Sequence, residues 1–83
     1  MGARWMTESE ILNSLTEMDK KAVLSYAENS MRMSRAAKAL FMVHSAVYYH
    51  IISIKAKTGL DPRNFYDLSK LINLIQKGET PSE

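Results

Sequence analysis

Apolar residues recur at helical spacing along most of the chain, and the clearest example lies within residues 45–57. Val47, Ile51 and Ile54 follow one another at intervals of four and three residues, which places their side chains on one face of a helix. Gly59 comes shortly after this segment, and glycine commonly ends a helix in the left-handed backbone conformation. The pattern therefore predicts a helix over residues 45–57 with one buried face.

A shorter segment, residues 34–42, precedes this helix and is rich in alanine. Small side chains allow a helix to lie close to its neighbour. We expect Ala37 and Leu40 to pack against the buried face of the following helix, and Ser34 to cap the first turn. Two helices joined by a tight corner form a helix-turn-helix, whose second helix enters the major groove of DNA.

Two capping boxes predict helices in the first third of the chain. A capping box pairs a Ser or Thr before the helix with a carboxylate or amide side chain three residues later. The two pairs are Thr7 with Glu10 and Thr16 with Asp19. We therefore expect helices over residues 8–15 and 17–28, with Asn29 as the C-terminal stop of the second.

An apolar stripe predicts one more helix near the end of the chain. The stripe consists of Phe65, Leu68, Leu71, Ile72 and Ile75. A turn over residues 60–62 comes before it, because Pro62 suits the first position of a helical turn. Asn64 and Asp67 form a cap-like pair at the start of the helix, and Gly78 is expected to stop it.

These elements predict an all-α fold, a small bundle of about five helices that contains the helix-turn-helix. Residues 1–6 and 79–83 lie outside the helical patterns, and we expect both ends to be flexible. A chain of 83 residues is enough for one small domain and too short for two. The prediction is therefore a single helix-turn-helix domain over residues 1–83.

Composition narrows the class of protein. Apolar residues make up 46% of the chain, which indicates a globular protein, and the low content of 3 Gly and 2 Pro favours helices. The absence of cysteine excludes disulfides and thiolate metal sites and fits a reducing compartment. Charges interrupt every apolar run before the roughly 18 residues of a membrane span, and the start lacks the apolar core of a signal peptide. We therefore expect a cytoplasmic protein with no membrane partner.

Positive charge is concentrated in the middle of the chain. Residues 29–63 contain several cations and the single acid Asp61, whereas residues 1–28 are slightly acidic. The cations are Arg32, Arg35, Lys38, Lys55, Lys57 and Arg63. This basic segment coincides with the predicted helix-turn-helix, as expected for a surface that contacts phosphates. The alternative, that each is an ordinary solvated side chain, stays open.

Several pieces of the chain match a known pattern in order and spacing. They are Tyr26-Ala27-Glu28-Asn29, then Ala36-Ala37-Lys38-Ala39-Leu40-Phe41, then Tyr49 with Ile54, then Thr58-Gly59-Leu60-Asp61-Pro62-Arg63-Asn64-Phe65, followed by Asp67 and Leu68. On these pieces, residues 26–75 resemble the C-terminal helix-turn-helix domain of bacterial PucR-type regulators, the group of purine-catabolism and sugar-diacid regulators. The resemblance implies a DNA-binding domain for transcription regulation, distantly similar in layout to the Fis type.

The start of the predicted recognition helix departs from this family. The family usually has His-Arg-Asn-Thr there, followed after two residues by Tyr-Arg. The corresponding residues in this chain are Val43-His44-Ser45-Ala46 and Tyr49-His50. Histidines thus stand where the family has arginines, and the scaffold positions match the family better than the reading surface does.

Candidate DNA contacts follow from the position of each residue on the two helices. The candidates for base contact are His44, Ser45, Tyr48 and Tyr49, and those for contact with the DNA backbone are Arg32, Arg35, Lys38, Lys55 and Lys57. Base edges are read from the first turn of a recognition helix. Ser45 has the alternative role of helix cap, and Tyr49 those of phosphate contact or structural support. His50 is expected to be a surface or packed histidine.

Self-association is a further open alternative. Trp5 and Ile52 are its candidate residues, because Trp5 lies outside the predicted helices and Ile52 is apolar on the outward side of the recognition helix. Helix-turn-helix domains commonly pair so that two recognition helices meet successive major grooves. Ile52 has the second alternative of contact with a thymine methyl group.

Catalytic and metal-binding patterns are not recognisable. His44 and His50 are six residues apart, which does not place both on one helix face, and there is no glycine-rich phosphate loop. We therefore expect no enzyme, no cofactor, no metal and no small-molecule ligand. The first functional hypothesis is sequence-specific binding of double-stranded DNA by a bacterial transcription regulator or a fragment of one. The alternative is a helical protein–protein interaction module that derives from a helix-turn-helix scaffold and does not bind DNA.

Overall fold

The computed structural model describes residues 7–79, and helices account for most of them. In chain order they are α1 (Glu8–Ser14), α2 (Glu17–Glu28), α3 (Met33–Ala39), α4 (His44–Thr58) and α5 (Phe65–Glu79). The described residues contain no strand, so the predicted small all-α fold is confirmed. No helix in this range is long and apolar enough to cross a membrane. Trp5 and most of the predicted flexible ends lie outside the described residues.

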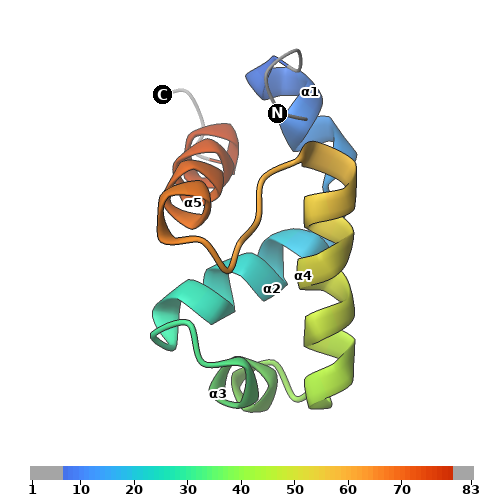
Figure 1. Cartoon of the computed structure of the whole chain (residues 1–83), viewed down its shortest axis with the longest axis vertical. Helices are drawn as coiled ribbons and strands as arrows, with labels where there is room; N and C mark the ends of the chain where they lie inside the picture. Colours follow the sequence, from blue (N-terminus) through green and yellow to red (C-terminus); the bar gives the residue numbers. More distant parts are fainter. Residues whose placement is uncertain (1–6, 80–83) are drawn as a thin grey trace.

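The helices are arranged around α4, which runs along one edge of the molecule (Figure 1). α2 packs against α3, α4 and α5, and α3 packs against the end of α4 at which that helix begins. α1 lies at the opposite end of the molecule and contacts α4 and α5. α3 and α4 are thus the two helices of the predicted helix-turn-helix, and α2 supports both.

The buried side of α4 forms the centre of the core. Val47, Ile51 and Ile54 are completely buried, as their spacing predicts. The other helices contribute Ile11 from α1, Ala22 and Val23 from α2, Ala36 and Ala37 from α3, and Leu71 and Ile75 from α5. Complete burial of one large aliphatic side chain contributes about 1.5–3 kcal/mol. The three residues of α4 therefore attach this helix firmly to its neighbours.

Both predicted capping boxes are present and start α1 and α2. In each box the backbone N–H of the acidic residue donates to the threonine hydroxyl, and the carboxylate accepts from the N–H of the threonine. The two distances are 3.1 and 2.8 Å for Thr7 with Glu10, and 3.0 and 3.1 Å for Thr16 with Asp19. Leu15 has extended backbone angles, so α1 ends one residue earlier than predicted.

α2 and α3 end in the same hydrogen-bond pattern, a Schellman motif. After α2, the N–H of Ser30 donates to Ala27 O (3.2 Å) and the N–H of Met31 donates to Tyr26 O (2.8 Å). After α3, the N–H of Phe41 donates to Lys38 O (3.1 Å) and the N–H of Met42 donates to Ala37 O (2.9 Å). Glycine is the usual residue at the left-handed position of this motif because it has no Cβ. Here the position is held by Ser30 (φ 58°) after α2 and by Phe41 (φ 56°) after α3.

These closures shift α3 away from its predicted limits. The predicted cap at Ser34 is wrong, because α3 starts one residue earlier and its N-cap is Arg32, which makes no side-chain capping bond. The early start follows from the bend after α2, where Met31 also has a positive φ of 60°. α3 then ends before its predicted boundary because Phe41 leaves the helical region of backbone space.

Gly59 closes α4, as predicted. It has a φ of 80°, and its N–H donates to Lys55 O at 2.9 Å. The buried hydroxyl of Thr58 supports the same corner, donating to Ile54 O (2.8 Å) and accepting from the N–H of Leu60 (3.0 Å). The end of α4 is therefore fixed by both backbone and side-chain bonds.

The predicted cap of the last helix is also present. Asn64 Oδ1 accepts from the N–H groups of Tyr66 and Asp67 at 3.0 and 3.1 Å, which starts α5. The predicted stop at Gly78 is wrong, because α5 continues through it. A glycine inside a helix costs only about 1 kcal/mol relative to alanine, so it does not end a helix by itself.

Replacing Phe41 with glycine should raise the free energy of unfolding by about 0.5–1 kcal/mol. The left-handed conformation costs a non-glycine residue roughly 1–2 kcal/mol, and the larger entropy of an unfolded glycine cancels part of that gain. The Phe41 side chain is 97% exposed, so its removal loses almost no packing. Urea unfolding measures the difference, with Phe41→Ala as the control that keeps a Cβ and should not stabilise. A loss of stability in Phe41→Gly would contradict this explanation.

Candidate nucleic-acid interface

The outward side of α4 carries all of the predicted base-contact residues. His44 and Ser45 lie in the first turn of the helix, Tyr48 and Tyr49 lie in the second, and all are exposed. Residues four apart share a helix face, so His44 and Tyr48 form one strip, and Ser45 and Tyr49 form the strip beside it. The structure therefore brings these side chains together on the side of α4 that faces away from the core.

The alternative role of Ser45 as helix cap is wrong. The N-cap of α4 is Val43, which has an extended backbone (φ −79°, ψ 155°) and makes no side-chain capping bond. Ser45 lies inside the first turn, where its side chain is exposed beside His44. Its hydroxyl is thus placed among the other base-contact candidates.

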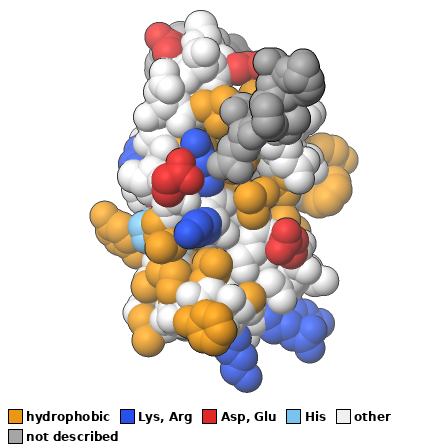
Figure 2. Space-filling view, turned by 180° about the vertical axis from the view of Figure 1, so that it is seen from behind, with side chains coloured by type: hydrophobic (Ala, Val, Ile, Leu, Met, Phe, Trp, Pro, Cys, Tyr) orange, Lys and Arg blue, Asp and Glu red, His pale blue; other side chains and the backbone are white. Residues whose placement is uncertain are grey.

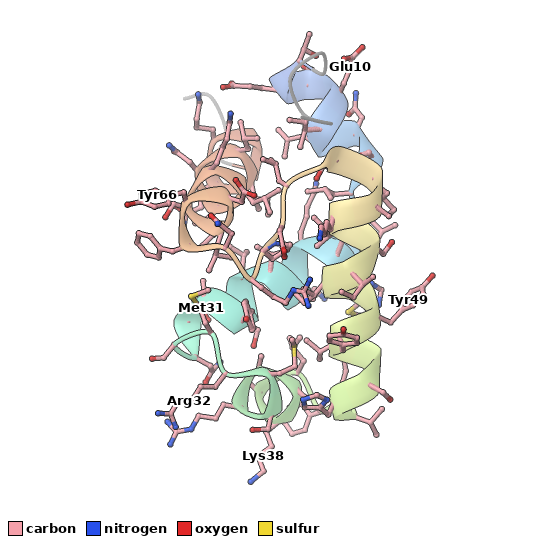
Figure 3. All side chains as sticks on the ribbon, in the orientation of Figure 1. Glu10, Met31, Arg32, Lys38, Tyr49 and Tyr66 are labelled. Carbon is pink, nitrogen blue, oxygen red and sulfur yellow. The ribbon has the colours of Figure 1, made fainter. Side chains whose placement is uncertain are left out.

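Three of the predicted backbone contacts lie on or next to α3. Arg32 precedes the helix, and Arg35 and Lys38 lie on it; all are exposed, and none makes an ion pair with another described residue. Figure 2 shows that the charged side chains at this end of the molecule are basic and that the acidic ones lie farther up. Arg32 and Lys38 project away from the body there (Figure 3). Since residues 29–60 contain no acid, this end presents uncompensated positive charge.

Lys55 and Lys57, the other two predicted backbone contacts, lie at the far end of α4 and face carboxylates. Lys55 Nζ is 3.7 Å from Asp61 Oδ2, and its side chain is largely exposed. Lys57 Nζ is 2.6 Å from Asp19 Oδ2. The two lysines therefore differ from the α3 cations, because each faces an acid of the same chain, and of the two only Lys57 is held closely.

Asp19 connects the start of α2 to α4. Its side chain is only 2% exposed, and its carboxylate contacts both Lys57 and the Nδ1 atom of His50, the latter at 2.8 Å. Burial alone raises the pKa of the Asp19 carboxyl, but hydrogen bonds from Lys57, His50 and the N–H of Thr16 together hold that pKa below its usual value. The carboxylate is therefore charged and links two helices.

The sequence predicts Asp19 only as part of a capping box. A signal for its second role exists on α4, because His50 and Lys57 are seven residues apart and thus lie on one helix face. Nothing in the sequence identifies the acid that this face meets, since Asp19 is 31 residues from His50. The expectation that His50 is a surface or packed histidine agrees with its half-buried position.

The structure does not bring the two histidines together. His44 is exposed at the start of α4, whereas His50 faces Asp19 and contacts the ring of Tyr49 edge to face at 5.3 Å between centroids. Among residues 7–79, no group of three or more His, Asp or Glu side chains is placed to hold a metal ion. Ile52, the candidate for self-association on the same helix, is half-buried.

Two apolar residues at the turn before α4 were missed by the sequence analysis as surface candidates. Phe41 is 97% exposed and Val43 is 68% exposed, although both belong to the helix-turn-helix. The α3 cations lie at the same end of the molecule, because Phe41 N–H bonds to the carbonyl of Lys38. The signal in the sequence was the run of apolar residues across a predicted corner.

Comparison with protein families gives a match over more than half of the chain. The model of the PucR C-terminal helix-turn-helix domain matches residues 21–72. This region starts in α2 and ends in α5, so it contains α3, the turn and α4 completely. Comparisons with curated proteins and with solved structures gave no significant match.

Replacing Asp19 with asparagine should lower the free energy of unfolding by about 2 kcal/mol near neutral pH. Asparagine keeps the size of the side chain and can still cap α2, but it removes the charge that Lys57 and His50 face. Glu17→Gln is the matched control, because Glu17 is an exposed acid of the same helix turn whose only ion pair within residues 7–79, with Lys20, spans 3.6 Å. That variant should change stability by less than about 0.5 kcal/mol.

The effect of Asp19 should depend on pH in a defined direction. Its folded-state pKa lies below the unfolded value of about 3.9, so the unfolded chain binds more protons as the pH falls. The stabilisation is therefore complete well above that value and is lost as the solution becomes more acidic. Urea unfolding of wild type and Asp19→Asn from pH 7 to pH 3 should show the two stabilities converging. A difference that stays constant over this range would contradict the assigned role.

Proposed function

The chain belongs to the PucR C-terminal helix-turn-helix domain family, and from this premise we propose that it binds double-stranded DNA sequence-specifically through α4. It does so as a transcription regulator or as the DNA-binding part of one. The observation that carries the proposal is the position of uncompensated cations on α3 at the same end as the exposed first turn of α4. Cations beside a recognition helix supply the phosphate contacts that orient it on the duplex.

In the proposed complex the first two turns of α4 lie in the major groove. His44, Ser45 and Tyr48 then face base edges, where hydroxyl and imidazole groups accept or donate single hydrogen bonds. Tyr49 lies on the neighbouring strip of the helix, where its hydroxyl reaches a phosphate or a base edge. The hydroxyl and imidazole groups on this surface can hydrogen-bond to a DNA duplex, and the fold places them on the second helix of a helix-turn-helix.

The proposed phosphate contacts come mainly from α3. Arg32, Arg35 and Lys38 are exposed and project from the end that approaches the duplex. Lys55 extends this set along α4, on the same strip as Tyr48. We leave Lys57 out, because its ammonium group bonds to the buried Asp19 carboxylate and is needed to hold α4 on α2.

Lys38→Ala and Tyr48→Ala should weaken DNA binding in different ways. Lys38→Ala should reduce affinity for every duplex and lower the slope of log K against log salt by about 0.9, because one phosphate contact is lost. Tyr48→Ala should leave that slope unchanged and reduce affinity for a selected site by about 2- to 12-fold, because a single hydrogen bond to a base contributes about 0.5–1.5 kcal/mol. Fluorescence anisotropy at several salt concentrations measures both, using a duplex selected from a random library.

Lys70→Ala is the matched control for this experiment. Lys70 is an exposed lysine on α5, a helix that packs on α1 and α2 away from the proposed interface. Its replacement should change neither affinity nor salt slope beyond the small effect of one net charge. Absence of any duplex binding by the wild-type chain at low salt would refute the proposed function.

A second candidate function is helical protein–protein interaction, including the pairing of two copies. Phe65 and Tyr66 at the start of α5 favour it, because they are 64% and 80% exposed and their rings meet edge to face at 5.7 Å. Tyr66 points away from the body of the molecule (Figure 3). Exposed apolar side chains that cluster on one surface commonly mark an interaction site. Ile52 on α4 offers a second, half-buried apolar contact.

Charging either surface should show whether it mediates association. If two copies pair through α4, Ile52→Glu should shift sedimentation equilibrium toward the monomer, because burying an unpaired carboxylate at an interface is costly. If they pair through α5, Tyr66→Glu should do so and Ile52→Glu should not. A wild-type chain that stays monomeric at all accessible concentrations would refute self-association through both surfaces.

A further inference from the structure

The turn between α3 and α4 exposes two apolar side chains, and packing within the domain does not explain why they are apolar. Phe41 and Val43 are 97% and 68% exposed. Phe41 is also held at a φ of 56°, a backbone conformation that is energetically unfavourable for any residue with a Cβ. Glycine would close α3 with less strain, so neither the core nor the backbone explains a phenylalanine here. Strain at an exposed position points to a function outside the folded chain.

The first three turns of α4 lack the side chains that read guanine or adenine by paired hydrogen bonds. Arg and Lys bind guanine in this way, and Asn and Gln bind adenine. Residues 43–54 contain none of these types. If this helix discriminates between DNA bases, it must therefore do so through single hydrogen bonds and apolar contacts.

The apolar feature of the major groove is the 5-methyl group of thymine. Phe41 and Val43 both lie in the turn that leads into α4, Val43 as the N-cap of that helix, and Phe41 N–H bonds to the carbonyl of Lys38. In the proposed complex, a phosphate contacted by Lys38 would therefore place this turn at the edge of the groove. The α3 cations beside Phe41 and Val43 suit the major groove, because phosphates border that groove and thymine methyl groups are exposed inside it.

We propose that Phe41 and Val43 read thymine methyl groups, so that the preferred duplex has A·T pairs opposite the turn before α4. The inference rests on the proposed DNA-binding function and names the base class that the same surface selects. It assigns specificity to the turn and to the N-cap residue, in addition to the exposed strip of α4.

Substitution of thymine by deoxyuridine tests the inference, because it removes the methyl group and keeps base pairing. The full chain is measured by fluorescence anisotropy on a duplex selected from a random library, with deoxyuridine replacing one thymine at a time. Wild type should lose about fourfold in affinity at each contacted thymine, as expected for one buried methyl group. Elsewhere in the duplex the replacement should have no effect.

Two variants assign the effect to individual residues without endangering the fold. Phe41→Gly relieves the left-handed strain, and Val43→Ser introduces a favourable N-cap hydroxyl. Each should abolish the thymine–deoxyuridine difference at a different position of the site. Phe65→Ala is the control, because it removes an exposed aromatic ring from α5, at the start of that helix, and should keep both differences.

The outcomes separate this inference from the proposed function. Salt-dependent duplex binding with no response to deoxyuridine at any position would overturn methyl recognition and leave DNA binding intact. Retention of both differences in Phe41→Gly and Val43→Ser would overturn the assignment to these residues. Tighter binding to the single strand than to the duplex would also overturn it, since exposed aromatic rings would then be stacking on unpaired bases. Absence of all DNA binding would refute the proposed function itself.

Discussion

The buried carboxylate of Asp19 determines how α4 is rotated on the rest of the molecule. A charge out of water is costly unless it is paired, and the two side chains that pair with it, His50 and Lys57, lie on one face of α4. That face must therefore turn toward the start of α2. The apolar face of α4 turns toward the remaining helices for a separate reason, burial. With both directions fixed, the strip that contains His44 and Tyr48 has to face outward.

The closures of α2 and α3 determine the angle at which the chain enters α4. Each closure places a residue with a Cβ in the left-handed region, Ser30 and Phe41, at a cost of roughly 1–2 kcal/mol. Such strain persists because the buried alanines of α3 and the apolar face of α4 hold the surrounding helices in place. The tight corner is thus maintained by the core, and the exposed side chain of Phe41 does not contribute to it.

Local signals were sufficient to predict most of the fold. Capping boxes, the apolar face of α4 and the stop at Gly59 depend on residues close in sequence, and each was confirmed. The limits of α3 were not predictable, because a left-handed Phe41 is rare and the pattern of apolar residues runs past it. In the site, helical periodicity predicted which side of α4 is exposed. The pairing of Lys57 with Asp19 could not be predicted, since it joins residues 38 apart through tertiary packing.

The size of the domain bears on how tightly it can hold DNA. Three cations on and beside α3 give one copy few phosphate contacts, and each contributes only about 0.9 to the salt slope. Helix-turn-helix proteins gain affinity by placing two recognition helices about 34 Å apart, in successive major grooves. The Cα atoms of this chain extend 32 Å along each of the two longer axes. In the proposed complex, a domain of this extent leaves room for a second copy at the adjacent groove, and that copy would double the phosphate contacts. In the proposed complex the number of copies would therefore set the affinity, and the turn with the first helical turns of each α4 would set the base preference.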